Sequence, residues 1–277
     1  MDKCGRGRRK TKKQKPFVQV CLDKARLARS KGDYATAMEW YICASQKGSG
    51  EAMGAIGSFY LCGLGVEQNF ALAHEWLSKG ASKKDGQALA HLGKMYIDGL
   101  GVLQNEQKAF ECFLQSADKN NMDGLLGAMR CLQTGIGTQV DEQKAYFYCQ
   151  KAAQLGNDWA QNEIGIAYYL GRFGKIYKDE KDKVGQSDYL YAEFWFDKSA
   201  EQGNANAMCN LATMYQNGFG RKKHVDEMLN LFTFDDRPVG QPNYQMALHW
   251  YQKAVEHGSE SAKQKLATLQ SQMKQHN

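Results

Sequence analysis

A 36-residue repeat is the feature that most constrains how this chain can fold. Four alanines lie at this interval, each followed by a large or soft side chain three residues later and by small residues seven and eight residues later. They are Ala37, Ala73, Ala109 and Ala145, and the same pattern returns from Ala192 and Ala247. Residues at offsets 0, +3, +4, +7 and +8 share one face of a helix. Each alanine therefore marks a helix, called helix A below, whose packing face mixes large and small side chains.

A second helical block, called helix B, follows 15 to 23 residues after each alanine. In the first unit it contains Ala52, Ile56, Gly57 and Tyr60, and it ends at the paired glycines of residues 63–65. Glycine accepts the positive φ that ends a helix and turns the chain. Each unit is thus helix A, turn, helix B and glycine turn. Because neither helix can bury its face alone, we expect neighbouring units to stack.

Two stretches carry a family resemblance. The pattern W-Y-x-x-A-x-x-x-G followed by L-G-x-x-Y-x-x-G-x-G-V is complete or nearly so in residues 40–66 and 76–102, the latter ending in GKMYIDGLGV. It resembles the Sel1-like repeat family, a relative of the tetratricopeptide repeats, over about residues 34–270. The resemblance implies an all-α, right-handed α-solenoid of about six helix-turn-helix repeats. It also implies an adaptor or scaffold of the kind found in signalling, secretion and host-contact pathways.

The domain prediction has two parts. Residues 1–16 are predicted to be a disordered basic arm, and residues 17–277 a single solenoid in which 17–31 form an N-terminal capping helix. Two insertions lengthen the glycine turns between units, where a solenoid tolerates extra chain. They cover residues 172–189 and 221–244. The first is charged and predicts a solvated loop.

The second insertion is too apolar for a bare solvated loop. Its apolar residues include Leu231, Phe232 and Phe234. Two interpretations stay open: these side chains pack on the flank of the last two units, or they form a partner-binding lip.

The charge of the chain is concentrated in the arm. The formal net charge is +6, yet residues 1–16 hold eight basic residues and one acid, which leaves −1 for the rest. The basic residues of interest are Arg6, Arg8, Arg9, Lys10, Lys12, Lys13 and Lys15. Three interpretations stay open: an inert solvated tail, nonspecific contact with nucleic acid or an acidic partner, and a nuclear-localisation or membrane-surface signal. The arm lacks the interleaved aromatic residues of a specific single-strand site.

Little in the sequence suggests catalysis, a cofactor or a metal. The cysteines within the repeats fall at different offsets, so no repeated disulfide is expected, and without a signal peptide we predict reduced thiols and a cytoplasmic location. If the arm is a targeting signal, the location would be nuclear or in a host cell. The histidines lack metal-ligand spacing. Ser116 and Lys119 match S-x-x-K, but Ser116 occupies a small-residue position of the repeat. No apolar run reaches the ~18 residues of a membrane span.

The predicted partner site lies on helix A, two residues after each packing alanine, where side chains are expected to line the concave side of the superhelix. These residues are Glu39, Glu75, Glu111, Phe147, Phe194 and His249. Carboxylates followed by aromatic residues would fit a peptide that is basic at one end and apolar at the other. Alternatively, the glutamates are ordinary solvated residues and the aromatics fill gaps between units, or the glutamates dock the basic arm.

The sequence therefore predicts a non-enzymatic adaptor that binds a protein or peptide through the concave face and the 221–244 insertion. The alternative is a nucleic-acid-associated protein that uses the arm. The oligomeric state is not predicted.

Overall fold

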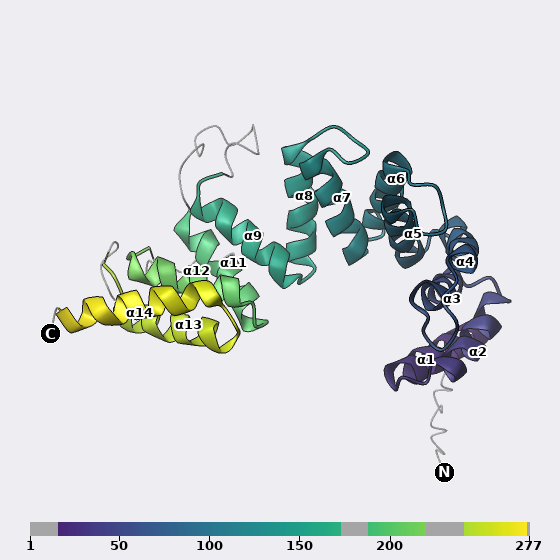
Figure 1. Ribbon diagram of the computed structural model, residues 1–277, viewed down its shortest axis with the longest axis horizontal. Helices are drawn as coiled ribbons and strands as arrows, with labels where there is room; N and C mark the ends of the chain where they lie inside the picture. Colours follow the sequence, from purple (N-terminus) through teal and green to yellow (C-terminus); the bar gives the residue numbers. More distant parts are fainter. Residues whose placement is uncertain (1–15, 173–187, 220–240, 276–277) are drawn as a thin grey trace, which may run out of the picture. The chain divides into compact units, whose positions relative to one another are not determined.

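The computed structural model describes residues 16–172, 188–219 and 241–275 (Figure 1). These residues form thirteen helices and no strand, which confirms the predicted all-α fold. The helices fall into two compact units that divide after Gly124, and each is described by itself. Residues Leu231, Phe232 and Phe234 and the basic residues of the arm lie outside the described residues.

The first unit contains the predicted capping helix and the first repeats. Its helices are α1 (Phe17–Ser30), α2 (Tyr34–Ser45), α3 (Gly50–Cys62), α4 (Phe70–Ser82), α5 (Gly86–Asp98) and α6 (Glu106–Ala117), and α7 (Met122–Thr134) crosses the division. Helices α2, α4 and α6 are helices A, whereas α3 and α5 are helices B. Each helix B packs most extensively against the helix A of the next repeat, as α3 does against α4, and α3 also packs against α5.

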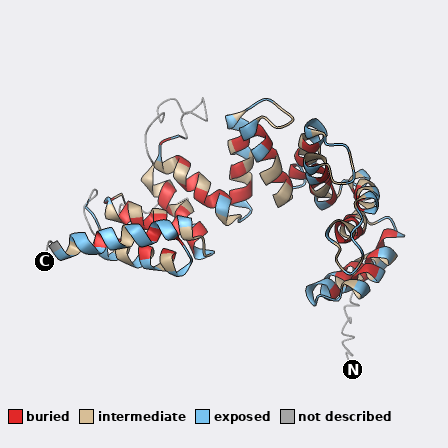
Figure 2. Ribbon diagram, in the orientation of Figure 1, coloured by how far each residue is buried: buried red, intermediate tan, exposed pale blue. Residues whose placement is uncertain are grey.

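The second unit repeats this arrangement. Its helices are α8 (Glu142–Gln154), α9 (Asp158–Tyr169), α11 (Tyr189–Glu201), α12 (Ala205–Gln216), α13 (Tyr244–Glu256) and α14 (Glu260–Gln275). Here α9 packs against α11, and α12 packs against α13. Most helices carry both buried and exposed residues along their length (Figure 2). This is the burial pattern that the helical spacing predicts.

The packing face of helix A agrees with the repeat. All six alanines that define the repeat are buried. The large residue four positions after the alanine is also buried in five of the six repeats, and in the remaining repeat the residue is Cys149. These five are Tyr41, Leu77, Phe113, Phe196 and Tyr251.

Glycines on helix B create space for these large residues. A Cβ atom added to Gly93 would lie 2.7 Å from Cε1 of Phe113 in the next helix A, so any larger residue would meet the ring. The same relation holds for Gly57 with Leu77 and for Gly165 with Phe196. Two repeats depart from the pattern. Ala212 stands at the glycine position before Tyr251, and Met129 stands there in the repeat where the residue that would face it is the smaller Cys149. A large and a small residue have exchanged sides, which conserves the combined volume.

Asn, Asp and Ser residues cap the N-termini of most of the described helices. In every described helix A, a side-chain oxygen of the N-cap residue accepts a hydrogen bond from the backbone N–H three residues later. These caps are Asp33, Asn69, Asn105, Asp141, Asp188 and Asn243. The predicted glycine turns are also present, since Gly63 and Gly99 end α3 and α5 with φ of 67°.

Candidate partner-binding site

The six predicted positions on helix A lie at the surface. Glu39, Glu75, Glu111, Phe147 and His249 are exposed, and Phe194 is half-buried. None of them lines either of the two cavities described below. That these residues face the inner side of a superhelix stays a prediction.

Basic side chains on the same helices cover part of this surface. Lys79 Nζ lies 2.6 Å from Glu75 Oε1, one helical turn away. In later repeats a lysine lies over the aromatic ring instead, with Lys151 Nζ 4.7 Å from the centroid of Phe147. Glu75 therefore already has a cation of its own, although an exposed pair of this kind contributes little to stability.

Polar side chains join consecutive helices B, which the sequence analysis missed. In the first unit, Gln87 donates to Asp123 and accepts from Asn121, both at 3.0 Å. In the second unit, Asn210 Nδ2 donates to Asn162 Oδ1 at 2.9 Å. Asparagine recurs twelve residues after the packing alanine, and this recurrence could have indicated the contact of Asn121 but not that between Asn162 and Asn210.

Ser116 has a structural role. It is fully buried, and its Oγ donates to the backbone carbonyl of Gly86 at 2.6 Å. Ser199, at the same position of a later repeat, donates to the carbonyl of Asp158 at the same distance. The hydroxyl thus satisfies a carbonyl in the first turn of a preceding helix B, which explains why this position accepts a serine in place of a smaller residue.

Among the described residues, no cysteine forms a disulfide. Burial raises the pKa of Cys149 to about 12 and that of Cys112 to about 11. Both are therefore protonated and poorly nucleophilic at neutral pH. Within the described ranges, no three His, Cys, Asp or Glu side chains are placed to share a metal ion. Nor does any helix in those ranges combine the length and apolar character needed to cross a membrane.

A cavity of about 280 Å³ lies in the first unit. Its polar lining residues are Arg29, Tyr41, Glu51, Ser58, Asp85, Gln87 and His91. The two oxygens of Glu51 accept hydrogen bonds from Arg26 Nε and Nη2 at 2.8 and 2.6 Å. Asp85 caps α5 by accepting from the N–H of Ala88 at 2.8 Å. Both carboxylates of this cavity are therefore engaged within the protein.

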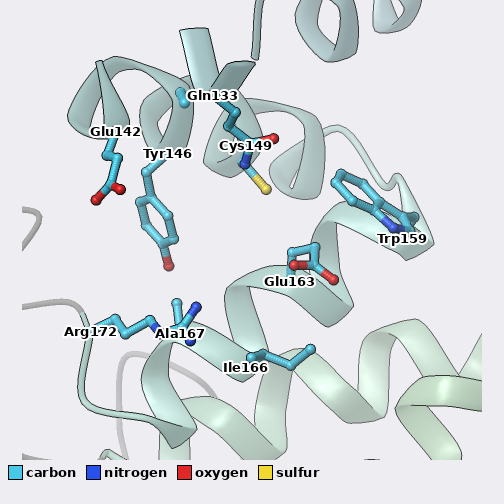
Figure 3. A pocket seen from close by; sticks show the side chains of 10 residues that line it. Gln133, Glu142, Tyr146, Cys149, Trp159, Glu163, Ile166, Ala167 and Arg172 are labelled. Atoms are coloured by element: carbon cyan, nitrogen blue, oxygen red, sulfur yellow. The ribbon is translucent and has the colours of Figure 1, made fainter. Parts of the chain in front are cut away.

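A larger cavity, of about 360 Å³, lies between α8 and α9 in the second unit (Figure 3). We call it the α8–α9 cavity. Helix α8 contributes Glu142, Ala145, Tyr146 and Cys149, α9 contributes Trp159, Glu163, Ile166 and Ala167, and Gln133 and Arg172 complete the lining. Trp159 is 42% exposed. The cavity thus combines aromatic walls with two carboxylates and one guanidinium.

Glu163 is the most buried of the charged side chains that are described in the lining of the α8–α9 cavity. The side chain is half-buried, and burial raises its pKa, while a hydrogen bond with Asn162 and the charge of Arg172 lower it in part. Across the described segments, no Lys or Arg nitrogen lies within 4.0 Å of the carboxylate oxygens of Glu142 or Glu163. Two carboxylates therefore face the cavity without a direct ion pair.

The chain consists of repeated pairs of helices, and a large side chain of one pair packs against a glycine of the preceding pair. This arrangement defines it as a helical-repeat protein. Its sequence matches the profile of the Sel1 repeat seven times, and the chain belongs to the Sel1 repeat family. The matches cover residues 27–49, 50–85, 86–121, 125–157, 160–204, 205–228 and 234–259. A typical match runs from a helix B through the next helix A, so its phase differs from that of our A–B units. The family prediction is confirmed.

Solved structures of Sel1 repeat proteins are similar to this chain. The Sel1 repeat protein from Oxalobacter formigenes is 25% identical, with a TM-score of 0.67 over 90% of this chain and 89% of that chain. A protective antigen present in uropathogenic Escherichia coli strains is 25% identical, with a TM-score of 0.65 over 91% of this chain and 49% of that chain. The chain thus spans about half the length of that antigen. A sequence search of curated proteins gives no match.

Proposed function

We propose that this chain is a non-enzymatic adaptor that binds a partner protein mainly through its fourth repeat, α8 and α9 with their flanking turns. Members of the Sel1 repeat family are generally scaffolds for protein–protein interaction. The observation that supports the fourth repeat is the distribution of exposed apolar side chains. Five of the eleven large exposed ones in the described ranges fall between residues 140 and 170. They are Val140, Phe147, Leu155, Trp159 and Leu170.

Exposed aromatic residues favour a protein interface, and one of those in the fourth repeat, Trp159, also lines the α8–α9 cavity. Phe147 is 44% exposed and Trp159 is 42% exposed, so both keep a large apolar area in water. Tryptophan and other aromatic residues contribute most of the binding energy at many interfaces, especially where they enter or line a pocket. The glutamates at positions 39, 75 and 111, the 221–244 insertion and a cytoplasmic location remain part of the proposal.

Site-specific photo-cross-linking tests this proposal. A photoreactive amino acid replaces Phe147 or Trp159 in the full chain, and cross-linking is carried out in cells that produce it. We expect both positions to cross-link to the same partner protein. The matched control is position 103, because Leu103 is 89% exposed but lies in the first unit. Equal cross-linking from position 103, or none from 147 and 159, would contradict the proposal.

A further inference from the structure

We infer that the α8–α9 cavity binds an arginine side chain presented by the partner protein. The inference rests on the proposed function and names the chemistry that the fourth repeat recognises. Three features of the cavity carry it: two carboxylates without an ion pair to a described residue, two aromatic rings, and the contrast with the cavity of the first unit, whose carboxylates are engaged within the chain.

The carboxylates create the need for a cation. Glu142 and Glu163 line the cavity, and among the described residues of the lining Arg172 is the one cationic side chain. Glu163 is half-buried and lies outside ion-pair distance of any described Lys or Arg nitrogen. A carboxylate that has lost part of its hydration is stabilised in its charged form when a cation with hydrogen-bond donors approaches. The cavity is therefore electrostatically suited to a cationic group.

The aromatic residues favour guanidinium over ammonium. Glu163 lines the same cavity as the aromatic residues Tyr146 and Trp159 (Figure 3). A guanidinium is flat, stacks on aromatic faces and carries five donors, so it can contact a ring and a carboxylate together. A lysine ammonium is more strongly hydrated and has no planar face.

In the first unit, an arginine of the same chain pairs with a carboxylate that lines a cavity. There Glu51 accepts two hydrogen bonds from Arg26, at 2.8 and 2.6 Å, and the guanidinium comes from α1 of the same chain. No Lys or Arg nitrogen of the described residues lies within ion-pair distance of Glu163. Glu51 occupies a different position of its repeat, and it serves as a comparison because its carboxylate is already paired within the chain.

Substitution of Arg172 should change arginine binding in the opposite direction to substitution of Glu163. Its charge already acts on Glu163, because it lowers the pKa of that carboxyl group. An arginine entering from a partner would be repelled by Arg172 while it is attracted by Glu163. Removing Arg172 should therefore strengthen binding, whereas removing the charge of Glu163 should weaken it.

The experiment follows the indole N–H signal of Trp159 by NMR in the full chain, with the signal assigned through Trp159→Phe. The probe is the peptide acetyl-Gly-Gly-Arg-Gly-Gly-amide. Its matched control carries citrulline, a neutral side chain of the same shape, in place of arginine. We expect the arginine peptide to shift the signal saturably with a Kd of about 1 mM, and the citrulline peptide to bind at least about tenfold more weakly. Equal binding of the two peptides, or no shift with arginine, would overturn the inference.

Variants separate recognition from folding. We expect Glu163→Gln to weaken arginine binding about tenfold, Arg172→Gln to strengthen it about twofold to threefold, and Glu51→Gln to leave it unchanged. Glu163→Gln should also raise the melting temperature slightly, because burial penalises the charged form of Glu163 in the folded protein. A purely structural glutamate would lose stability instead. If Glu163→Gln fails to fold, Arg172→Gln and the citrulline peptide still decide the matter.

The two proposals can fail separately. If positions 147 and 159 cross-link to a partner but the arginine peptide does not bind, the arginine site is wrong and the adaptor function stands. If the arginine peptide binds as expected but no partner is cross-linked, the cavity is real and the proposed adaptor function is wrong.

Discussion

At the scale of single residues, contact between successive repeats depends on a glycine of helix B and a large side chain of the next helix A. Gly93 shows this most simply, because a Cβ atom there would lie 2.7 to 2.9 Å from three carbons of the Phe113 ring. Phe113 is buried and belongs to the next repeat. A single methyl group therefore tests whether the repeats depend on this space.

We expect Gly93→Ala to destabilise the protein by about 1–2 kcal/mol. Overpacking costs roughly 1–3 kcal/mol, and the higher helix propensity of alanine offsets less than about 1 kcal/mol of this cost. Phe113→Leu should remove part of the clash, so the double variant should lose less than the two single losses added together, with a coupling of about 0.5–1.5 kcal/mol. Urea unfolding followed by circular dichroism gives these values. The control is Ala212→Gly, since alanine already stands at this position facing a large residue, Tyr251. Additive effects of the two single variants would refute direct contact.

The sequence predicted the residues of the packing face but not how they pair between repeats. The alternation of large and small side chains depends only on helical spacing, so the burial of Phe113 and of the packing alanines followed from it. That Phe113 enters the space at Gly93 depends on how far one helix is shifted along its neighbour. The environment of Glu163 was missed for a similar reason, since it is created when Tyr146 of α8 and Arg172 come near it in the folded chain.

At the scale of helices, the N-caps decide where each helix A begins, and one of them can be tested by pH. The side chain of Asp141 accepts from the N–H of Lys144 at 3.0 Å, and its other oxygen lies 3.1 Å from Lys144 Nζ. Hydrogen bonding and this charge lower the pKa of Asp141 below its ordinary value of 3.8. The stability that the ionised cap contributes is therefore present above pH 3.8 and is lost as the pH falls through the lower pKa of the folded state.

We expect Asp141→Asn to be about as stable as the original chain at pH 7, because asparagine caps helices about as well as aspartate. Between about pH 5 and pH 2 the variant should lose less stability, since its cap does not titrate. Thermal unfolding across this range measures the difference. The reverse change, Asn105→Asp at the preceding helix A, should make stability more sensitive to acid. Identical pH profiles for all three proteins would show that these caps do not contribute through their charge.

The starts of the helices could be predicted from the sequence, whereas the conformation of the insertions could not. An Asn or Asp lies four residues before every packing alanine, from Asp33 to Asn243, and this recurrence predicts the cap once the repeat is aligned. The insertions have no counterpart in the other repeats. The alternatives of packing and lip for Leu231, Phe232 and Phe234 therefore both remain predictions.

At the scale of the whole molecule, charge separates the arm from the helices. The chain carries a formal charge of +6, and residues 1–15 hold eight basic residues and one acid, so the remainder carries −1. Contacts with nucleic-acid phosphates scale with the number of cations that reach them and weaken steeply with salt. A cavity that recognises one arginine side chain has no such dependence on the arm. The two candidate functions therefore belong to different parts of the chain.

We expect the full chain to be retained on immobilised double-stranded DNA at low ionic strength, and the variant lacking residues 1–15 to pass through. Retention should fall with a slope of log K against log salt of about −0.9 for each phosphate contacted. A second variant, in which the seven Arg and Lys residues from Arg6 to Lys15 become glutamine, keeps the length of the arm and should behave like the deletion. Both variants should bind the arginine peptide as the full chain does. If the deletion variant is retained as strongly as the full chain, nucleic acid must contact residues 16–277 instead. Because these residues carry a formal charge of −1, the contact would have to be made by a local basic surface.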